Sequence, residues 1–212
     1  MSSWRYGVSR SAQQVDDEAV AAAPRAQRAD AKRNRELLVT AAAELFDERG
    51  IEAPLEEIAR RAQVGIGTLY RHFPTRDVLI EAVYRHEVEM LCDGVDDLLA
   101  HNPPDAALAA WMRAFALYVA RKRGMAMALK SFLGADSDLF TQSHQRIQGA
   151  IGTLVAAAVD AGTIRSDVDP SDLLRAMGGI CMAADTPGWA DRTGRLVDLL
   201  MDGLRYGAPA PR

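Results

Sequence analysis

Ile51–Phe73, with the sequence IEAPLEEIARRAQVGIGTLYRHF, is the stretch that decides the fold of this 212-residue chain. Leu55, Ile58 and Ala62 recur at the spacing of one helix face, and a second short helical pattern ends in LYRHF. The break at 63–65 separates the two patterns. Two short helices joined by a turn of a few residues form a helix-turn-helix, whose second helix enters the DNA major groove. The stretch therefore predicts a DNA-binding regulator rather than an enzyme.

The segments on either side of this motif carry further helix signals. Apolar residues from Leu37 to Phe46 recur at i, i+3 and i+4, which predicts a helix that begins at Asp30 and stops at Gly50. Pro54 is expected at the first position of the next helix, where its missing N–H is harmless. After the motif, Thr75 can cap a long helix that connects two domains.

The rest of the chain repeats helical patterns, with prolines at helix starts and glycines at helix ends. One long helix is expected from Thr75 towards Leu99. Gly124 is expected to interrupt the helix that follows Pro103, and three more helices follow. No convincing period-two pattern appears, so the fold class is all-α with about nine helices. We expect an N-terminal three-helix helix-turn-helix domain and a larger C-terminal helical domain for ligand binding and dimerisation.

The domain boundaries follow from these patterns. Residues 1–24 show no clear period and end in an Ala run and a proline, which is typical of a mobile arm. The expected units are a flexible arm at 1–28, a helix-turn-helix DNA-binding domain at 29–76 with its motif at 54–73, an effector-binding and dimerisation domain at 77–206, and a flexible tail at 207–212.

The formal net charge of −4 does not by itself indicate or exclude binding to nucleic acid, because the charges are distributed unevenly along the chain. Residues 25–80 hold 10 Lys/Arg and 9 Asp/Glu, a local balance of +1. The basic residues gather at the start of this region and around the second helix of the motif: Arg25, Arg28, Lys32, Arg33, Arg35, Arg60, Arg61, Arg71 and Arg76. A local basic footprint of this kind is enough for phosphate contacts.

Other site classes find no support in the sequence. Cys92 and Cys181 lie far apart and belong to no CxxC pair, and the four His show no metal spacing, so no metal site is expected. Gly65 and Gly67 follow a helix rather than a strand, so they form no dinucleotide fingerprint, and no cofactor is expected. No apolar run approaches the ~18 residues of a membrane span, and the first residues, MSSWRYGVSR, lack the apolar stretch of a signal peptide. We therefore expect a cytoplasmic protein without a membrane partner.

With these residues in view, the sequence resembles the TetR family of bacterial transcriptional regulators. The resemblance covers about residues 31–91: a first helix ending in AAAELFDERG, then LEEIARRA, the turn, GTLYRHF, and a fourth helix opening with PTRDVLIEAV. It implies a homodimer that represses a promoter and releases the double-stranded DNA operator on binding a small molecule. The family usually has Ser or Thr at the position of Pro54 and often Gly at the position of Gln63, so operator details are expected to differ.

The resemblance also implies roles for single residues. It assigns Tyr70 and His72 to phosphate contacts and gives Arg76 the same role, although Tyr70 and His72 could instead pack or cap the helix. Arg71 points outward and can either fork onto guanine or hold a phosphate, and both alternatives stay open. The remaining predicted DNA-binding residues lie near the first helix or at the start of the recognition helix: Lys32, Arg33, Gly65, Ile66, Gly67 and Thr68.

The C-terminal region offers candidates for an effector pocket and a dimer interface. A moderately apolar effector is expected among the aromatic and Met residues, with two polar anchors, although an aromatic stripe is also typical of a core. The pocket candidates are Trp111, Phe115, Tyr118, Met127, Phe132, Phe140, Met177 and Trp189, with His144 and Asp185 as anchors. The dimer-interface candidates on the last two long helices are Leu173, Leu174, Leu196, Leu199 and Leu200.

Two other functions are alternatives to a ligand-released repressor. An enzyme built on a helical bundle would need metal-binding pairs such as Glu-x-x-His, and no such pair occurs. A ligand-independent regulator, or an activator, would act through DNA or protein contacts alone. A hydrophobic cavity in the C-terminal domain separates the ligand-dependent from the ligand-independent regulator.

Overall fold

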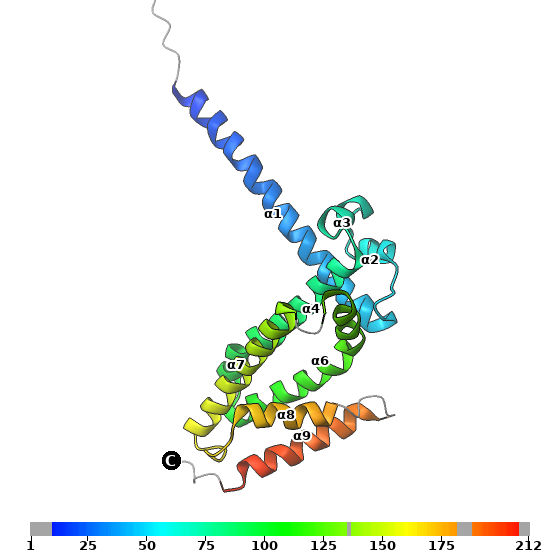
Figure 1. Cartoon of the computed structure of the whole chain (residues 1–212). Coiled ribbons are helices and arrows are strands. Elements are labelled where there is room, and N and C mark those ends of the chain that lie inside the picture. The colour runs from blue at the N-terminus through cyan, green and yellow to red at the C-terminus, as the bar shows by residue number, and fades with distance from the viewer. Residues whose placement is uncertain (1–9, 135–136, 182–187, 208–212) are drawn as a thin grey trace, which may run out of the picture.

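The computed structural model describes residues 10–134, 137–181 and 188–207, and these residues form helices but no strand (Figure 1). The prediction of an all-α fold with about nine helices is confirmed. In chain order the helices are α1 (Arg10–Arg49), α2 (Leu55–Arg61), α3 (Ile66–His72), α4 (Arg76–Asp93), α5 (Val95–His101), α6 (Pro104–Leu133), α7 (Asp138–Asp160), α8 (Pro170–Cys181) and α9 (Trp189–Arg205).

α1 extends away from the rest of the molecule over its N-terminal part (Figure 1). It begins at Arg10, whereas the sequence predicts a helix from Asp30 and a flexible arm over 1–28. Residues 1–9 of that arm lie outside the described residues. The segment after Arg10 contains many Ala and several Gln residues, which favour a helix. At the other end Gly50 has φ +79°, the left-handed conformation that glycine favours, as predicted for this stop.

The three-helix domain is held together by a small core at the C-terminal part of α1. Leu38, Leu45, Ile58, Leu69 and Phe73 are almost completely buried there. Each such side chain contributes about 1.5–3 kcal/mol on burial. Pro54 lies one residue before α2, as its N-cap rather than its first residue. This core fixes α2 and α3 against α1, and so determines which face of α3 remains outside.

The cap predicted for the helix after the motif is confirmed, but the length of that helix is not. The backbone N–H of Val78 donates to Thr75 Oγ1 at 3.3 Å. The helix expected to reach Leu99 is divided at Gly94 into α4 and α5. α4 therefore reaches less far than predicted, although it still contacts both α1 and the helices of the C-terminal domain.

α6 runs unbroken through Gly124, where the sequence predicts an interruption. Glycine inside a helix costs about 1 kcal/mol relative to alanine. Met125 and Leu129, which follow, are both buried, and each contributes about 1.5–3 kcal/mol on burial. The packing of this face against the core therefore outweighs the glycine.

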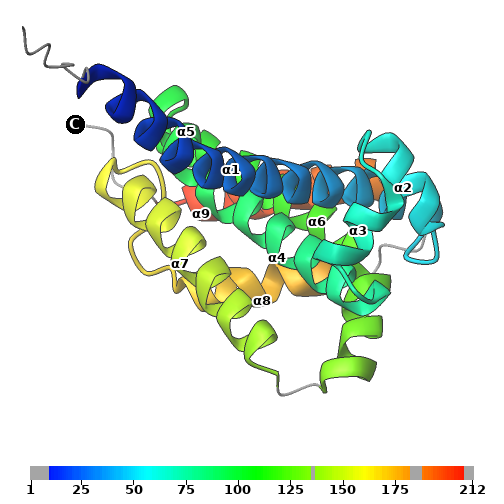
Figure 2. The ribbon, with the colours of Figure 1, turned by 90° about the horizontal axis from the view of Figure 1, so that it is seen from above.

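The C-terminal domain is built around α4, α6 and α7. Trp111 on α6 is buried, and its indole Nε1–H donates to the carbonyl oxygen of Leu91 at 3.0 Å. α8 and α9 pack on α6 and lie side by side at the end of the molecule opposite α2 and α3 (Figures 1 and 2). None of the described helices is long and apolar enough to span a membrane.

Candidate functional site

The turn between α2 and α3 contains a residue in a strained conformation. Gln63 has φ +56°, and no other non-glycine residue described in the structure has a positive φ. An L-residue in the left-handed region costs roughly 1–2 kcal/mol. The N–H of Val64 donates to the carbonyl oxygen of Ala59 at 2.9 Å across this turn. The turn thus reverses the chain within a few residues and directs α3 away from α2.

α3 buries one face and exposes the other. Leu69 and Phe73 are buried, as predicted. On the opposite face Arg71 is exposed, Tyr70 is 47% exposed and Ile66 is 39% exposed. Two further predicted contact residues, Thr68 and His72, are half-buried at the edges of this face. We refer to residues 65–72 without the buried Leu69 as the α3 surface.

The two glycines of the α3 surface are not required by the packing of the protein. A Cβ atom on Gly65 or Gly67 would meet no other atom within 4 Å, and neither residue has a positive φ. Gly67 lies in the first turn of α3, where alanine would favour the helix. The absence of side chains here leaves the backbone of the helix start open to an external partner.

Most of the arginines predicted to surround α3 are engaged within the protein. Arg61 donates to both carboxylate oxygens of Glu48 at 2.6 and 2.9 Å, and Arg60 pairs with Glu57 at 3.2 Å. The hydrogen bond from Arg61 lowers the pKa of the Glu48 carboxyl below its usual value. These arginines therefore add little net positive charge to the α3 surface.

Arg76 is also engaged within the protein, whereas Arg71 is not. The Arg76 guanidinium donates to the carbonyl oxygens of Ile51 and Ala53 at 2.7 and 2.8 Å, which ties the start of α4 to the α1–α2 loop. Arg71 makes no hydrogen bond or ion pair with any residue that the structure describes. Arg71 is thus the member of this arginine group whose guanidinium is available to a ligand.

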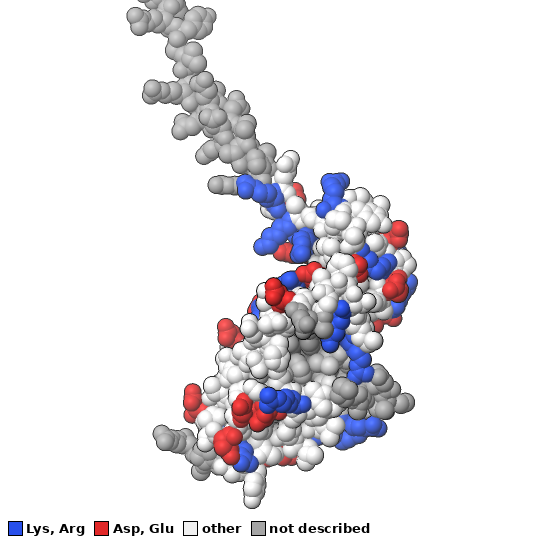
Figure 3. Space-filling model, viewed as in Figure 1, with Lys and Arg blue, Asp and Glu red and all other residues white. Residues whose placement is uncertain are grey.

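A second group of basic residues lies on α1 beside this domain. Lys32 makes an exposed pair with Glu36 at 3.8 Å, and Arg33 is exposed. Arg35 instead stacks over the Phe73 ring, 5.3 Å from its centroid, and so links α1 to the end of α3. On the face shown in Figure 3, Lys and Arg side chains gather where α1 meets the three-helix domain.

The predicted effector residues do not gather in one cavity. Trp111 and Phe115 stack at 5.5 Å in the core, and Met177 is fully buried. Met127 and Phe132 are 69% and 55% exposed, and line none of the described cavities. Asp185 lies outside the described residues.

The other effector candidates are spread over three sites. Phe115 and His144 line a cavity of about 290 Å³. Tyr118 lines a second, of about 220 Å³, and Phe140 packs edge-on against the neighbouring Tyr84 at 5.8 Å. Trp189 lines a third, of about 200 Å³, where its buried Nε1–H has no hydrogen-bond partner among the described residues.

The Tyr118 cavity contains a residue that the sequence analysis did not single out, Lys122. Trp111, Phe115, Tyr118 and Lys122 follow one another at spacings of four, three and four residues, so they share one face of α6. The apolar pattern of this helix predicts a buried face as far as Val119, and Lys122 continues that face. Its position on a buried face is the signal that could have identified it.

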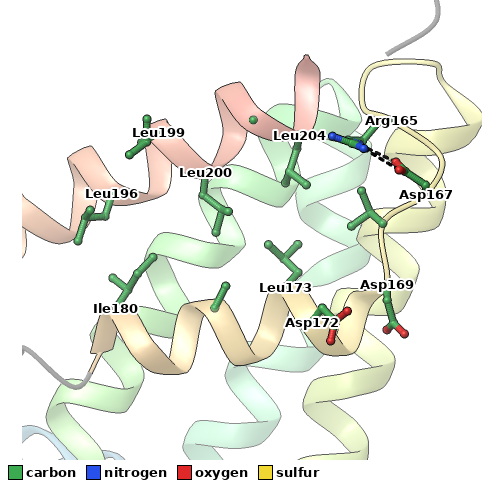
Figure 4. Close-up of a pocket in the computed structure, with 13 residues that line it drawn as sticks. Arg165, Asp167, Asp169, Asp172, Leu173, Ile180, Leu196, Leu199, Leu200 and Leu204 are labelled. Atoms are coloured by element: carbon green, nitrogen blue, oxygen red, sulfur yellow. Dashed lines mark hydrogen bonds and ion pairs between the residues drawn. The ribbon is translucent and has the colours of Figure 1, made fainter. Parts of the chain in front are cut away.

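The predicted dimer leucines border the largest described cavity, a groove of about 570 Å³ between α8 and α9. Leu196 and Leu200 of α9 project towards α8 in Figure 4, whereas Leu199 lies on the outer side of α9 at the rim of the groove and is 69% exposed. Leu173 lines the groove floor, whereas Leu174 is buried against the other side of α8. The Arg165–Asp167 ion pair closes one end at 2.5 Å. We call this the α8–α9 groove.

A compact three-helix domain that exposes the second helix of a helix-turn-helix defines the class of helix-turn-helix transcriptional regulators. Residues 38–83 match the family described as bacterial regulatory proteins, tetR family, and residues 103–206 match the C-terminal domain of SbtR-like transcriptional regulators. The TetR transcriptional regulator SCO0520 from Streptomyces coelicolor is 48% identical, with a TM-score of 0.73 over 81% of this chain and 98% of that one.

Two further relatives agree. The TetR regulatory protein from Mycobacterium vanbaalenii is 35% identical, with a TM-score of 0.69 over 84% of this chain and 99% of that one. The HTH-type transcriptional regulator SAR0097 of Staphylococcus aureus (strain MRSA252) is 33% identical over 81 residues, which are 37% of this chain and only 42% of the relative. The chain belongs to the TetR family of transcriptional regulators, and is not an enzyme.

Proposed function

We propose that this protein is a homodimeric repressor that binds a palindromic double-stranded DNA operator and is released by a small-molecule effector. The observation that carries the DNA-binding part is the α3 surface: an exposed helix face with an available arginine, a tyrosine beside it and two glycines at the helix start. Arg71 and Ile66 are assigned to base edges or nearby phosphates, and Tyr70 and His72 to phosphates.

The homodimer rests on the α8–α9 groove. Its leucines form an apolar surface that one protomer leaves open, and a two-fold axis would bring two such surfaces together as a four-helix seam. A palindromic operator has two half-sites, whose major grooves lie about 34 Å apart on one side of the duplex. One protomer carries a single recognition helix, so two protomers are needed to contact both half-sites. The α8–α9 groove lies at the end opposite α3, so pairing through it leaves both α3 surfaces accessible (Figure 1).

Selection from a random DNA duplex pool tests this function. The protein should enrich an inverted repeat whose half-sites are centred about 10 base pairs apart or a multiple of that spacing. Binding to the selected duplex should weaken by about 10³–10⁵-fold between 50 and 200 mM salt if 6–10 phosphates are contacted. Enrichment of no sequence, or an affinity that does not respond to salt, would contradict the proposal.

Replacing Gly67 with alanine should change protein stability and DNA affinity in opposite directions. The added methyl group meets no protein atom, so the helix should gain up to about 0.5–1 kcal/mol. The same methyl group would hold the start of α3 away from the duplex, and operator affinity should fall several-fold. Thermal unfolding and fluorescence anisotropy measure the two effects. Gly152→Ala, at a glycine inside α7 that also has open space for a Cβ atom, is the matched control and should leave DNA affinity unchanged.

A ligand-independent regulator is the second candidate function. It is favoured by the small volumes of the cavities lined by Phe115, Tyr118 and Trp189, which lie below the ~300–1,000 Å³ of drug-sized pockets. An activator is equally compatible with the α3 surface, because the position of the operator relative to the promoter determines the sign of regulation.

A further inference from the structure

Lys122 of α6 is a buried cation between two domains. Lys122 is only 2% exposed. The ammonium lies 3.3 Å from Glu87 Oε2 on α4 and 3.6 Å from Asp47 Oδ1 on α1. Both carboxylates are partly open to solvent, at 21% and 27% side-chain exposure. Lys122 is therefore more buried than either of the groups that neutralise it.

The two ion pairs leave the N–H donors of the Lys122 ammonium without a hydrogen bond. Charge-assisted N–H···O⁻ hydrogen bonds are about 2.7–2.9 Å long, and both separations exceed that range. No described atom accepts a hydrogen bond from Lys122 Nζ. An ammonium group has three N–H donors. A buried donor without a hydrogen-bond acceptor costs about 1–3 kcal/mol, and more when the donor is charged. An additional acceptor beside Lys122 would remove this cost.

The same lysine lines the cavity of about 220 Å³ between α4, α6 and α8. Aromatic and small side chains form most of its wall, from Tyr84, Tyr118, Val119 and Ala126. A second cation lines it: Arg123, whose guanidinium donates to the carbonyl oxygen of Cys181 at 3.0 Å. Burial raises the pKa of the Tyr118 phenol, whose hydroxyl group hydrogen-bonds with Tyr84. The cavity thus combines apolar walls with the Lys122 ammonium, which Glu87 and Asp47 contact from outside the cavity lining, and with the Arg123 guanidinium.

From this arrangement we propose that the Tyr84–Tyr118–Lys122 cavity binds a small organic carboxylate, aromatic or short-chain, with Lys122 as its cationic anchor. The proposal rests on the proposed ligand-released repressor and names the chemical class of its effector. A carboxylate would supply the missing acceptor to the ammonium, and the aromatic walls would cover its apolar part. The volume limits the ligand to a small one.

The partners of Lys122 connect this cavity to the DNA-binding domain. Asp47 lies at the end of α1, one residue before Glu48, which anchors α2 through Arg61. A bound carboxylate would compete with Asp47 for the ammonium and weaken the link between α6 and α1. By reciprocity, a carboxylate that lowers operator affinity must itself bind less tightly to the operator complex.

Thermal unfolding of the full chain without DNA tests the binding site. Benzoate and octanoate are the probes, and benzamide and octanamide are their neutral counterparts at equal ionic strength. At least one carboxylate should raise the Tm in a concentration-dependent manner, and its amide should not. Lys122→Met should weaken that carboxylate at least tenfold. Lys130→Met, at an exposed lysine on the same helix, should leave it unchanged.

A second variant covers the case in which Lys122→Met does not fold. Ala126→Leu keeps both cations but fills the cavity, and it should also abolish the Tm shift. Equal shifts with carboxylates and amides, or an undiminished shift in both variants, would overturn the proposal. Because this assay contains no DNA, its failure is separate from a failure of operator binding. A carboxylate that binds without lowering operator affinity would overturn the link through Asp47.

Discussion

Replacing Leu199 with aspartate should split the dimer and remove most of the operator affinity. Leu199 is 69% exposed in the protomer, so a polar side chain there disturbs no packing within one chain. In a two-fold interface the substitution occurs twice. Each lost leucine contributes about 1.5–3 kcal/mol, so dimerisation should weaken by about 3–6 kcal/mol, or roughly 100-fold to more than 10,000-fold.

Sedimentation and DNA binding measure this effect independently. The variant should sediment as a monomer at micromolar concentration with an unchanged helical circular dichroism spectrum. Met90→Asp is the matched control, because Met90 is 66% exposed on α4 and lies outside the α8–α9 groove. A Leu199→Asp protein that remains a dimer would show that another surface forms the interface.

The helix-turn-helix could be predicted because its signals are local. The period that buries Leu69 and Phe73 and the cap at Thr75 depend on residues within one or two turns. Local signals predicted an interruption at Gly124, where long-range packing of Met125 and Leu129 keeps α6 continuous. Local signals therefore sufficed for the helix-turn-helix, whereas the continuity of α6 depends on distant contacts.

For the candidate sites too, the sequence indicated which residue types are present but not how the fold brings them together. Sequence position indicated a basic group around α3, but only the folded chain reveals that Arg61 is neutralised by Glu48, thirteen residues away. The aromatic residues of the C-terminal domain were identified, yet their distribution over separate cavities depends on how α6, α7 and α8 pack. The buried charge of Lys122 requires three helices and has no short-range sequence signature beyond its place on the α6 stripe.

Replacing Arg71 with alanine should cause the largest loss of operator affinity among single substitutions on α3. A fork onto guanine provides ~1–3 kcal/mol of discrimination. A dimer presents the arginine twice, so about 2–6 kcal/mol is lost, or roughly 30-fold to more than 10,000-fold in the dissociation constant. Arg60→Ala is the matched control, because Arg60 already pairs with Glu57 and should lower affinity only slightly.

A conservative variant separates the two roles left open for Arg71. Lysine keeps the positive charge but cannot form a planar, bidentate contact. If Arg71 reads guanine, Arg71→Lys should lose affinity for the selected duplex and should relax the preference at one position of each half-site in a repeated selection. If Arg71 holds a phosphate, Arg71→Lys should bind the original duplex almost as tightly, while Arg71→Ala reduces affinity for all sequences and lowers the salt dependence. Unchanged affinity in Arg71→Ala would exclude both roles, and with them the assignment of the α3 surface to DNA.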